Sequence, residues 1–209
     1  MAKGTAYIIG AGDFTIRGLL PGARDLLIAA DGGYDSLRRF GIRPHLVLGD
    51  MDSITRLPKG IARLRFPEKK DLTDMALALH FARARGYRRF RLYGATGGRL
   101  DHSLANLQTL AGLAREGLQG IIVAPGVTIF SLADGSLRFP ALRAGTVVSV
   151  FCQGREALGV TLKGLEYPLH DARLDPFSPL GVSNQAQGQP FSVSVRQGVL
   201  LITVGSPPL

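Results

Sequence analysis

Leu46-Val47-Leu48-Gly49-Asp50-Met51-Asp52-Ser53 joins a short apolar run to a turn that carries two carboxylates. The apolar run is typical of a buried strand, and residues two apart in an extended chain point to the same face. We therefore expect Asp50 and Asp52 to lie side by side, where their charges repel unless a cation separates them. Mg²⁺ suits such a pair, because it binds one or two carboxylates and completes its shell with water and phosphate oxygens. A solvated acidic loop is the alternative interpretation.

Acidic residues gather in the first half of the chain, although the protein is basic overall. The sequence has 25 Lys and Arg against 16 Asp and Glu, a formal net charge of +9. Six of the acidic residues fall in short motifs marked by Gly or Thr, which indicates a site rather than a general surface property. They are Asp31, Asp50, Asp52, Asp71, Asp74 and Asp101.

The first half of the chain alternates short apolar strands with helical segments. Strands are predicted at 7–10, 26–30, 46–48, 90–94 and 121–123. One predicted helix ends near residue 40, a second begins at 71–74 and a third spans 101–116. This alternation predicts a mainly parallel sheet covered by helices, which binds ligands outside the carboxyl ends of its strands. Because most of the acidic motifs follow predicted strands, the sequence predicts one site at that edge.

The second half of the chain changes to short β-branched segments separated by turn signals. Strands are predicted at 127–130, 146–151, 160–162, 191–196 and 199–204, with Gln197-Gly198 as the turn between the last two. The fold class is therefore α/β: an N-terminal, mainly parallel α/β domain at 1–124, expected to bind nucleotide and metal, followed by a C-terminal antiparallel β-sandwich at 125–209.

Composition narrows the classes of protein. The single cysteine, Cys152, excludes an internal disulfide framework and fits a reducing compartment. The N-terminal apolar run is too short for a signal peptide, and no stretch approaches the roughly 20 apolar residues of a membrane helix. We therefore expect a cytoplasmic protein with no membrane partner. An Arg-rich segment at 83–91 comes without Trp or a standard nucleic-acid motif, so a solvated basic face is preferred to nucleic-acid binding.

Glycine motifs at strand ends are candidates for phosphate binding. Asp31-Gly32-Gly33 allows close backbone approach, although an ordinary turn has the same sequence. The segment 94–102 resembles a glycine loop that leads from a strand into a helix N-terminus, where Gly97 and Gly98 form an anion cradle and Arg99 offers a forked donor. It lacks the Gly-Lys-Ser/Thr ending of a P-loop. Gly10-Ala11-Gly12 does not complete a dinucleotide fingerprint.

The segment Lys69-Lys70-Asp71-Leu72-Thr73-Asp74 opens a predicted helix. Asp71 or Thr73 can cap this helix, which is a purely structural role. Asp74 lies three residues beyond Asp71, so both carboxylates can share one helix face. Lys70 beside them can neutralise a phosphate oxygen.

Taken together, these motifs resemble the thiamine pyrophosphokinase family, bacterial type, over roughly residues 29–204. The motifs that carry the resemblance occur in the family's order: Asp31-Gly32-Gly33, Gly49-Asp50-Met51-Asp52-Ser53, Lys70-Asp71-Leu72-Thr73-Asp74, Gly97-Gly98-Arg99-Leu100-Asp101-His102, Gly164-Leu165-Glu166-Tyr167-Pro168-Leu169 and Gly181-Val182-Ser183-Asn184-Gln185. The resemblance implies transfer of a pyrophosphoryl group from ATP to the hydroxyl of thiamine, giving thiamine diphosphate and AMP. It also implies Mg²⁺ and a homodimer that binds thiamine where the subunits meet.

The resemblance also implies roles for individual residues. Asp50, Asp52 and Asp74 are expected to hold metal, with Asp71 and Asp101 in support. Ser183 and Asn184 are expected to meet thiamine, although Gln185 stands where many relatives have Glu. In this scheme Lys70 and Arg99 spread the charge of the displacement, and Asp71 or Asp101 accepts the proton of the alcohol.

Two other functions fit part of the pattern. A pyrophosphokinase acting on another alcohol, such as a hydroxymethylpterin, would need the same metal and phosphate motifs. A non-catalytic sensor of nucleotide or thiamine would not need so many carboxylates. The motifs of the second half favour thiamine as the acceptor.

Overall fold

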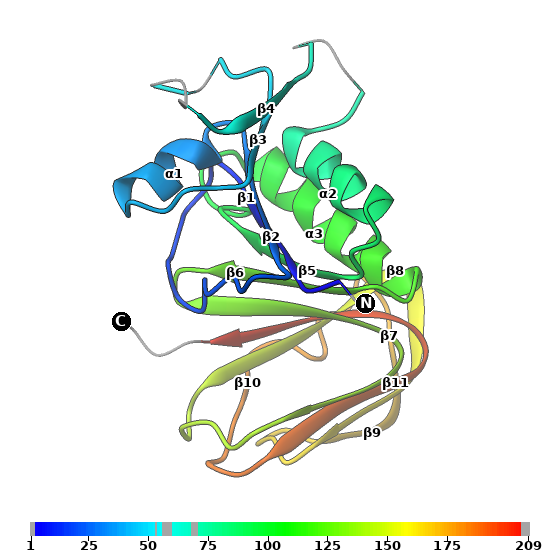
Figure 1. Ribbon diagram of the computed structural model, residues 1–209. Coiled ribbons are helices and arrows are strands. Elements are labelled where there is room, and N and C mark those ends of the chain that lie inside the picture. The colour runs from blue at the N-terminus through cyan, green and yellow to red at the C-terminus, as the bar shows by residue number, and fades with distance from the viewer. Residues whose placement is uncertain (1–2, 53, 56–59, 68–70, 206–209) are drawn as a thin grey trace. The chain divides into compact units, whose positions relative to one another are not determined.

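The computed structural model describes residues 3–52, 54–55, 60–67 and 71–205 (Figure 1). The chain divides into two compact units, Met1–Asn106 with Gln119–Pro125 and Leu107–Leu118 with Gly126–Leu209. The division of function between residues 1–124 and 125–209 stays a prediction.

The first unit is built on a parallel sheet in the order β6-β5-β1-β2-β3-β4. Its strands are β1 (Ala6–Ile9), β2 (Leu26–Ala30), β3 (Leu46–Gly49), β4 (Ala62–Arg65), β5 (Arg89–Tyr93) and β6 (Gln119–Ala124). The strands β1 and β3 are buried at every residue, as expected for parallel strands covered on both faces. The edge strand β4 was not predicted, because all its residues are exposed and apolar residues alternate with Arg.

Helices cover both faces of this sheet. They are α1 (Gly33–Arg39) and α2 (Asp74–Ala84), and a third helix, α3 (Leu100–Arg115), follows β5 in the chain and is divided between the two units. On the face of α1, Leu37 packs in one buried cluster with Ile9, Leu27 and Val47. Helix α2 lies against β1, β2 and β3 and turns a buried stripe inward, which includes Met75 and Leu79 (Figure 1). Residues three and four apart share a helix face, so this stripe follows from the sequence pattern.

The second unit is antiparallel, with strands in the order β10-β8-β11-β7 and β9 paired to β8. The strands are β7 (Val127–Phe139), β8 (Val147–Lys163), β9 (Leu169–Leu174), β10 (Asn184–Gln185) and β11 (Phe191–Gly205). Their inward side chains form a single apolar cluster, which contains Cys152. Burial raises the pKa of the Cys152 thiol, as expected for an inert cysteine. The parallel first part and antiparallel second part confirm the predicted fold class.

The predicted hairpin turn at Gln197-Gly198 is wrong. Residues 191–205 form one strand, β11, whose register shifts between Val195 and Val199. The facing strand β7 is irregular at the same level, since Asp134 has φ 45° and its carboxylate accepts a 2.7 Å hydrogen bond from the Gly198 N–H. The turn-like residues therefore mark a bulge that bends two long paired strands, a use of glycine that the sequence pattern does not separate from a hairpin.

No helix in the described part of the chain is long and apolar enough to cross a membrane.

Candidate active site

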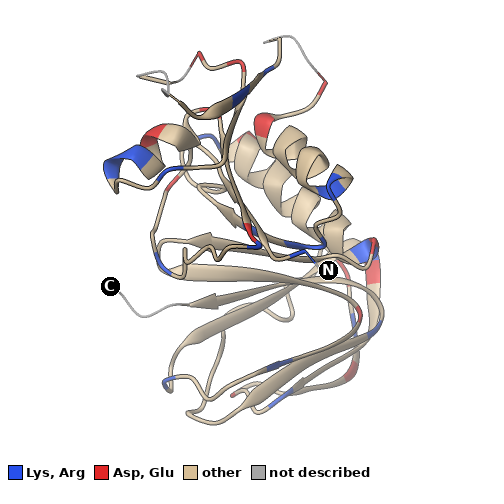
Figure 2. Ribbon diagram, viewed as in Figure 1, with Lys and Arg blue, Asp and Glu red and all other residues tan. Residues whose placement is uncertain are grey.

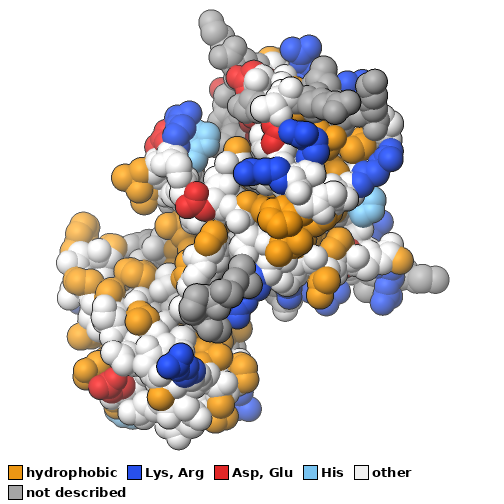
Figure 3. Space-filling model, turned by 90° about the vertical axis from the view of Figure 1, so that its left-hand side faces the viewer, with side chains coloured by type: hydrophobic (Ala, Val, Ile, Leu, Met, Phe, Trp, Pro, Cys, Tyr) orange, Lys and Arg blue, Asp and Glu red, His pale blue; other side chains and the backbone are white. Residues whose placement is uncertain are grey.

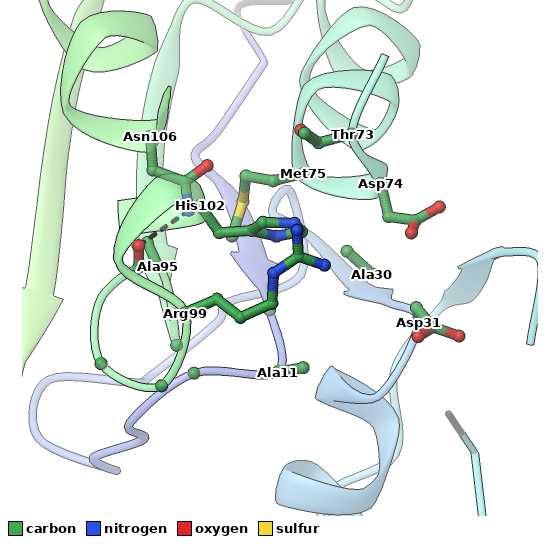
Figure 4. A pocket seen from close by; sticks show the side chains of 15 residues that line it. Ala11, Ala30, Asp31, Thr73, Asp74, Met75, Ala95, Arg99, His102 and Asn106 are labelled. Carbon is green, nitrogen blue, oxygen red and sulfur yellow. Dashed lines mark hydrogen bonds between the residues drawn. The ribbon is translucent and has the colours of Figure 1, made fainter. Parts of the chain in front are cut away.

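The candidate site lies at the carboxyl edge of the parallel sheet, as the sequence predicts. A cavity of about 280 Å³ opens there, lined by the ends of β1, β2 and β5 and by the starts of α2 and α3 (Figure 4). Acidic residues also mark the loop after β3 and the first turn of α2 (Figure 2). The shared direction of the strands is what brings these distant segments together.

Asp31 forms a carboxylate cluster with Asp50 and Asp52. One oxygen from each side chain lies within 4.8 Å of the others. Asp31 is 8% exposed and follows β2, where its N–H donates a 2.8 Å hydrogen bond to the carbonyl of Leu48. Three carboxylates at this separation repel one another, and hard oxygen ligands are what Mg²⁺ prefers. The donor set therefore fits a divalent cation.

The Asp50–Asp52 pair is formed by a turn and not by an extended strand. The strand β3 ends at Gly49, and Met51 has φ 69°, a left-handed conformation that is rare for a Met. The Asp52 N–H then donates to Oδ1 of Asp50 at 3.2 Å. The two carboxylates do lie close together, but the alternation of side chains along a strand is the wrong reason. Backbone strain of this kind is concentrated at functional sites.

Gly49 is the point where the acidic loops meet. Its φ is 148°, and a Cβ built there would lie 3.0 Å from Cβ of Asp31 and 3.1 Å from Oδ1 of Asp74. Asp31 and Asp74 therefore both approach the end of β3. Asp31 belongs to the carboxylate cluster with Asp50 and Asp52, although the sequence made it a candidate for phosphate binding. Asp74 lies next to this cluster. Which of these carboxylates hold metal stays a prediction.

The start of α2 settles which residue caps that helix. Thr73 is the N-cap, and its hydroxyl accepts a 3.2 Å hydrogen bond from the Ala76 N–H. Asp71 is exposed and lies before the cap. Asp74 occupies the first turn, where the helix dipole favours a negative charge. Lys70 lies outside the described residues.

The loops after β1 and β5 are joined by backbone hydrogen bonds that continue beyond the strands. The Gly10 N–H donates to the Tyr93 carbonyl at 2.7 Å, and the Gly12 N–H donates to the Gly94 carbonyl at 2.9 Å. A Cβ at Gly10 would lie 2.6 Å from the Gly94 carbonyl oxygen, so only glycine fits. Sequence reasoning missed these glycines because it tested them only as a dinucleotide motif. Their position directly after a predicted strand was the available signal.

The segment from Gly94 to Arg99 forms the opposite wall of the cavity. Gly97 and Gly98 both have positive φ, at 83° and 62°, and both line the cavity. Figure 4 shows Arg99 and His102 extending into the cavity toward the side that carries Asp31. The cavity therefore has an acidic side and a basic side, joined by glycine backbone.

Asp101 holds Arg99 and does not line the cavity. Nη2 and Nε of Arg99 donate to its two carboxylate oxygens at 2.6 and 3.2 Å. The hydrogen bond from Arg99 lowers the pKa of Asp101 to about 2, and the same contact raises the pKa of Arg99. Efficient proton acceptors have a pKa near the working pH, so Asp101 is poorly suited to accept a proton from an alcohol. The contact instead orients the guanidinium.

Asn106 is a further residue that sequence reasoning missed. It is 7% exposed, and its Nδ2 donates a 2.7 Å hydrogen bond to the carbonyl of Ala95 (Figure 4). This contact ties the glycine loop to α3, the helix that follows it. A single polar residue on an otherwise amphipathic helix gives little sequence signal, because most such residues face solvent.

In the second unit, Asn184 connects two of the sequence motifs. It is 3% exposed, and its Oδ1 accepts hydrogen bonds from the N–H groups of Tyr167 and Gln185, both at 2.9 Å. Its Nδ2 donates to the Tyr167 carbonyl at 2.6 Å. The described contacts of Asn184 are thus structural, whereas Ser183 is exposed with φ 62°. Direct contact of these residues with thiamine stays a prediction.

Two family models match the chain in succession. The model described as thiamin pyrophosphokinase, catalytic domain, matches residues 19–122. The model described as thiamin pyrophosphokinase, vitamin B1 binding domain, matches residues 136–200. The chain belongs to the thiamine pyrophosphokinase family. The resemblance seen in the sequence is therefore confirmed, and the chain is a member of an enzyme family.

Individual relatives agree with this assignment. A thiamine pyrophosphokinase from Bacillus subtilis (strain 168) is 28% identical over 183 residues, 85% of this chain and 86% of the relative. The crystal structure of a thiamin pyrophosphokinase from Geobacillus thermodenitrificans is 27% identical with a TM-score of 0.83, covering 97% of this chain and 98% of that one. A B. subtilis thiamine pyrophosphokinase structure shares the fold, with a TM-score of 0.87 at 24% identity, covering 98% and 100% of the two chains.

The two family models divide the site residues between them. The model of the thiamin pyrophosphokinase catalytic domain contains the carboxylate cluster, the segment 94–101 and Asn106. The vitamin B1 binding model contains Tyr167, Ser183 and Asn184. The lining residues of the cavity at the sheet edge fall within the range of the catalytic-domain model, except Gly10, Ala11 and Gly12, which precede it.

Proposed function

We propose that the protein transfers a pyrophosphoryl group from ATP to the hydroxyl of thiamine, giving thiamine diphosphate and AMP. The observation that carries the proposal is the cavity at the carboxyl edge of the parallel sheet, with a carboxylate cluster on one side and a glycine loop with Arg99 on the other. A polyphosphate needs cations on its oxygens and backbone N–H groups around it, and the two sides offer both. The family assignment supplies the acceptor.

Mg²⁺ is the proposed cofactor. Asp31, Asp50 and Asp52 would hold it, with Asp74 beside them as a further ligand from α2. The ion would neutralise negative charge on the phosphates during the displacement. This assignment keeps three residues of the sequence prediction and adds Asp31.

ATP is the proposed pyrophosphoryl donor, bound along the glycine loop. A Cβ at Gly98 would meet nothing within 4 Å, so the loop leaves room there for phosphate oxygens, and Arg99, paired with Asp101, supplies a guanidinium. Attack on the β-phosphorus releases AMP. Asp71 remains the proposed proton acceptor at the acceptor end, and Lys70 the proposed second cation, as the family resemblance implies.

The second unit, called here the β-rich unit, is the proposed thiamine-binding part.

We also propose a homodimer whose two chains share each site. The β-rich unit leaves large apolar side chains exposed, and Figure 3 shows hydrophobic side chains spread over one face of the molecule. Those of the β-rich unit are Val147, Phe151, Tyr167, Phe177, Leu180 and Val182. The loop 177–182 runs beside β8, where the Val150 N–H donates to the Gly181 carbonyl at 2.8 Å, so part of this set is contiguous. Exposed apolar patches are typical of interaction surfaces.

We propose a cytoplasmic enzyme with no nucleic-acid partner. The Arg-rich segment is engaged with its own chain: Arg85 lies over the ring of Phe81 at 3.4 Å, and Arg91 donates to the Gly18 carbonyl at 3.2 Å. These contacts support a structural and solvated role for the basic residues.

A direct test is AMP release from ATP and Mg²⁺ with thiamine, with a hydroxymethylpterin or with no acceptor. We expect release that depends on thiamine and yields one thiamine diphosphate for each AMP. Release that depends on the pterin would identify the other pyrophosphokinase. Binding of thiamine or ATP without any turnover would identify the sensor.

A further inference from the structure

A second cavity, of about 230 Å³, lies in the β-rich unit, and Gly164 is the one lining residue that belongs to the motifs quoted from the sequence. Arg138 on β7, Ser192 on β11 and Lys163 on β8 form one cross-strand row, because Ser192 is paired with Arg138 on one side and with Lys163 on the other. Neighbouring strands lie about 4.8 Å apart, so the backbones of Arg138 and Lys163 flank that of Ser192 at roughly 10 Å from each other. All three residues line the cavity.

The charge of this cavity is uncompensated within the described chain. Its lining contains two cations and no acidic residue. Neither Arg138 nor Lys163 takes part in an ion pair or side-chain hydrogen bond among the described residues, whereas Arg173 and Arg196 of the same unit are paired with Glu156 and Asp171. Two like charges held on one row repel each other unless an anion lies between them.

The backbone around this cavity is closely packed. Gly164 has φ 78°, and a Cβ there would lie 2.6 Å from the Pro190 carbonyl oxygen and 3.1 Å from Cα of Phe191. The rings of Phe191 and Phe139 stack at 4.6 Å with an interplanar angle of 9°. A close backbone approach and a buried aromatic pair therefore hold in place the strand ends that carry the cationic side chains.

We propose that this cavity binds a diphosphate group. One phosphoryl group lies beside Arg138, the other beside Lys163, and the Ser192 hydroxyl donates a hydrogen bond between them. Arg forms forked bonds to phosphate and Lys acts as a point charge, so the row offers donors at both ends of the ligand. Inorganic pyrophosphate and an organic diphosphate ester share this chemistry.

The test follows amide NMR shifts of the full-length protein without divalent metal. Pyrophosphate is expected to shift the amides of Gly164 and Ser192 in a saturable manner. The double substitution Arg138→Gln with Lys163→Gln is expected to weaken this binding at least about tenfold, because each charged hydrogen bond contributes that order of affinity. Shifts at Gly97 and Gly98 report the catalytic cavity separately and are expected to persist in the double variant. Thermal melting verifies that the exposed substitutions leave the fold intact.

The matched control removes two other exposed cations of the same unit, by Arg143→Gln with Arg155→Gln. An equal loss in this control would show general charge attraction and overturn the proposal. Sulfate or inorganic phosphate binding as tightly as pyrophosphate would overturn the assignment to a diphosphate. Thiamine diphosphate is tested as the organic diphosphate ester. If it shifts the amides of Gly164 and Ser192 while pyrophosphate does not, the cavity does not recognise the diphosphate group and the proposal is contradicted. Absence of shifts at Gly164 and Ser192 would refute the site.

Discussion

Gly49→Ala tests whether the end of β3 positions the carboxylates. The new methyl group would lie 3.0 Å from Cβ of Asp31 and 3.1 Å from Oδ1 of Asp74, closer than ordinary contact. The backbone at φ 148° is also unfavourable for alanine. A left-handed or similar conformation costs about 1–2 kcal/mol, and crowding of a packed site costs about 1–3 kcal/mol. We therefore expect a loss of roughly 2–5 kcal/mol in the free energy of unfolding.

Gly41→Ala is the matched control. Gly41 also has a positive φ, 67°, but a Cβ there meets nothing within 4 Å, so this variant should lose only about 1–2 kcal/mol. Urea unfolding measures both losses, and the Mg²⁺ dependence of AMP release measures the effect on the site. We expect Gly49→Ala to need more Mg²⁺ and Gly41→Ala to match the wild type. Equal stability losses, or an unchanged Mg²⁺ requirement in Gly49→Ala, would refute this reasoning.

Four other substitutions test separate contacts. Asn106→Ala leaves the Ala95 carbonyl without its hydrogen bond, so we expect the free energy of unfolding in urea to fall by about 1–3 kcal/mol. Relative to the wild type, we expect the KM for ATP to rise more than the KM for thiamine. The pKa of Asp101 is lowered to about 2, so its bond to Arg99 contributes stability above the usual Asp pKa and is lost only as the pH falls toward 2. A pH profile of activity between about 5 and 9 should therefore show no step that Asp101→Asn removes. Asn184→Ala should lower the melting temperature and raise the thiamine KM, whereas Ser183→Ala should raise the KM alone; equal melting temperatures would contradict the structural role of Asn184.

Much of the architecture could be predicted because it depends on local patterns. Apolar strands that alternate with helices specify a parallel sheet, and parallel strands place their carboxyl ends at one edge. Asp31, Asp50 and Asp52 each follow a strand of that sheet, so their convergence needed no knowledge of side-chain contacts.

The parts that could not be predicted depend on long-range contacts. The pairing of β7 with β11 decides that Gln197-Gly198 is a bulge, and nothing within ten residues of that dipeptide specifies the partner. Asn106 acts through Ala95, 11 residues earlier in the chain, and its role appears only when the loop is folded back on α3. Asn184 likewise bonds the backbone of Tyr167, 17 residues away.

Binding of Mn²⁺, followed by the electron paramagnetic resonance signal of the free ion, tests the central claim most directly. Mn²⁺ prefers the same oxygen ligands as Mg²⁺. If Asp31, Asp50 and Asp52 form one metal site, Asp31→Asn and Asp52→Asn should each weaken binding by about tenfold or more, since even indirect partners of a metal contribute that much. Asp101→Asn, which removes a carboxylate paired with Arg99 outside the cluster, should bind Mn²⁺ as the wild type does. Equal affinity in Asp31→Asn and the wild type, or an equal loss in Asp101→Asn, would contradict the account.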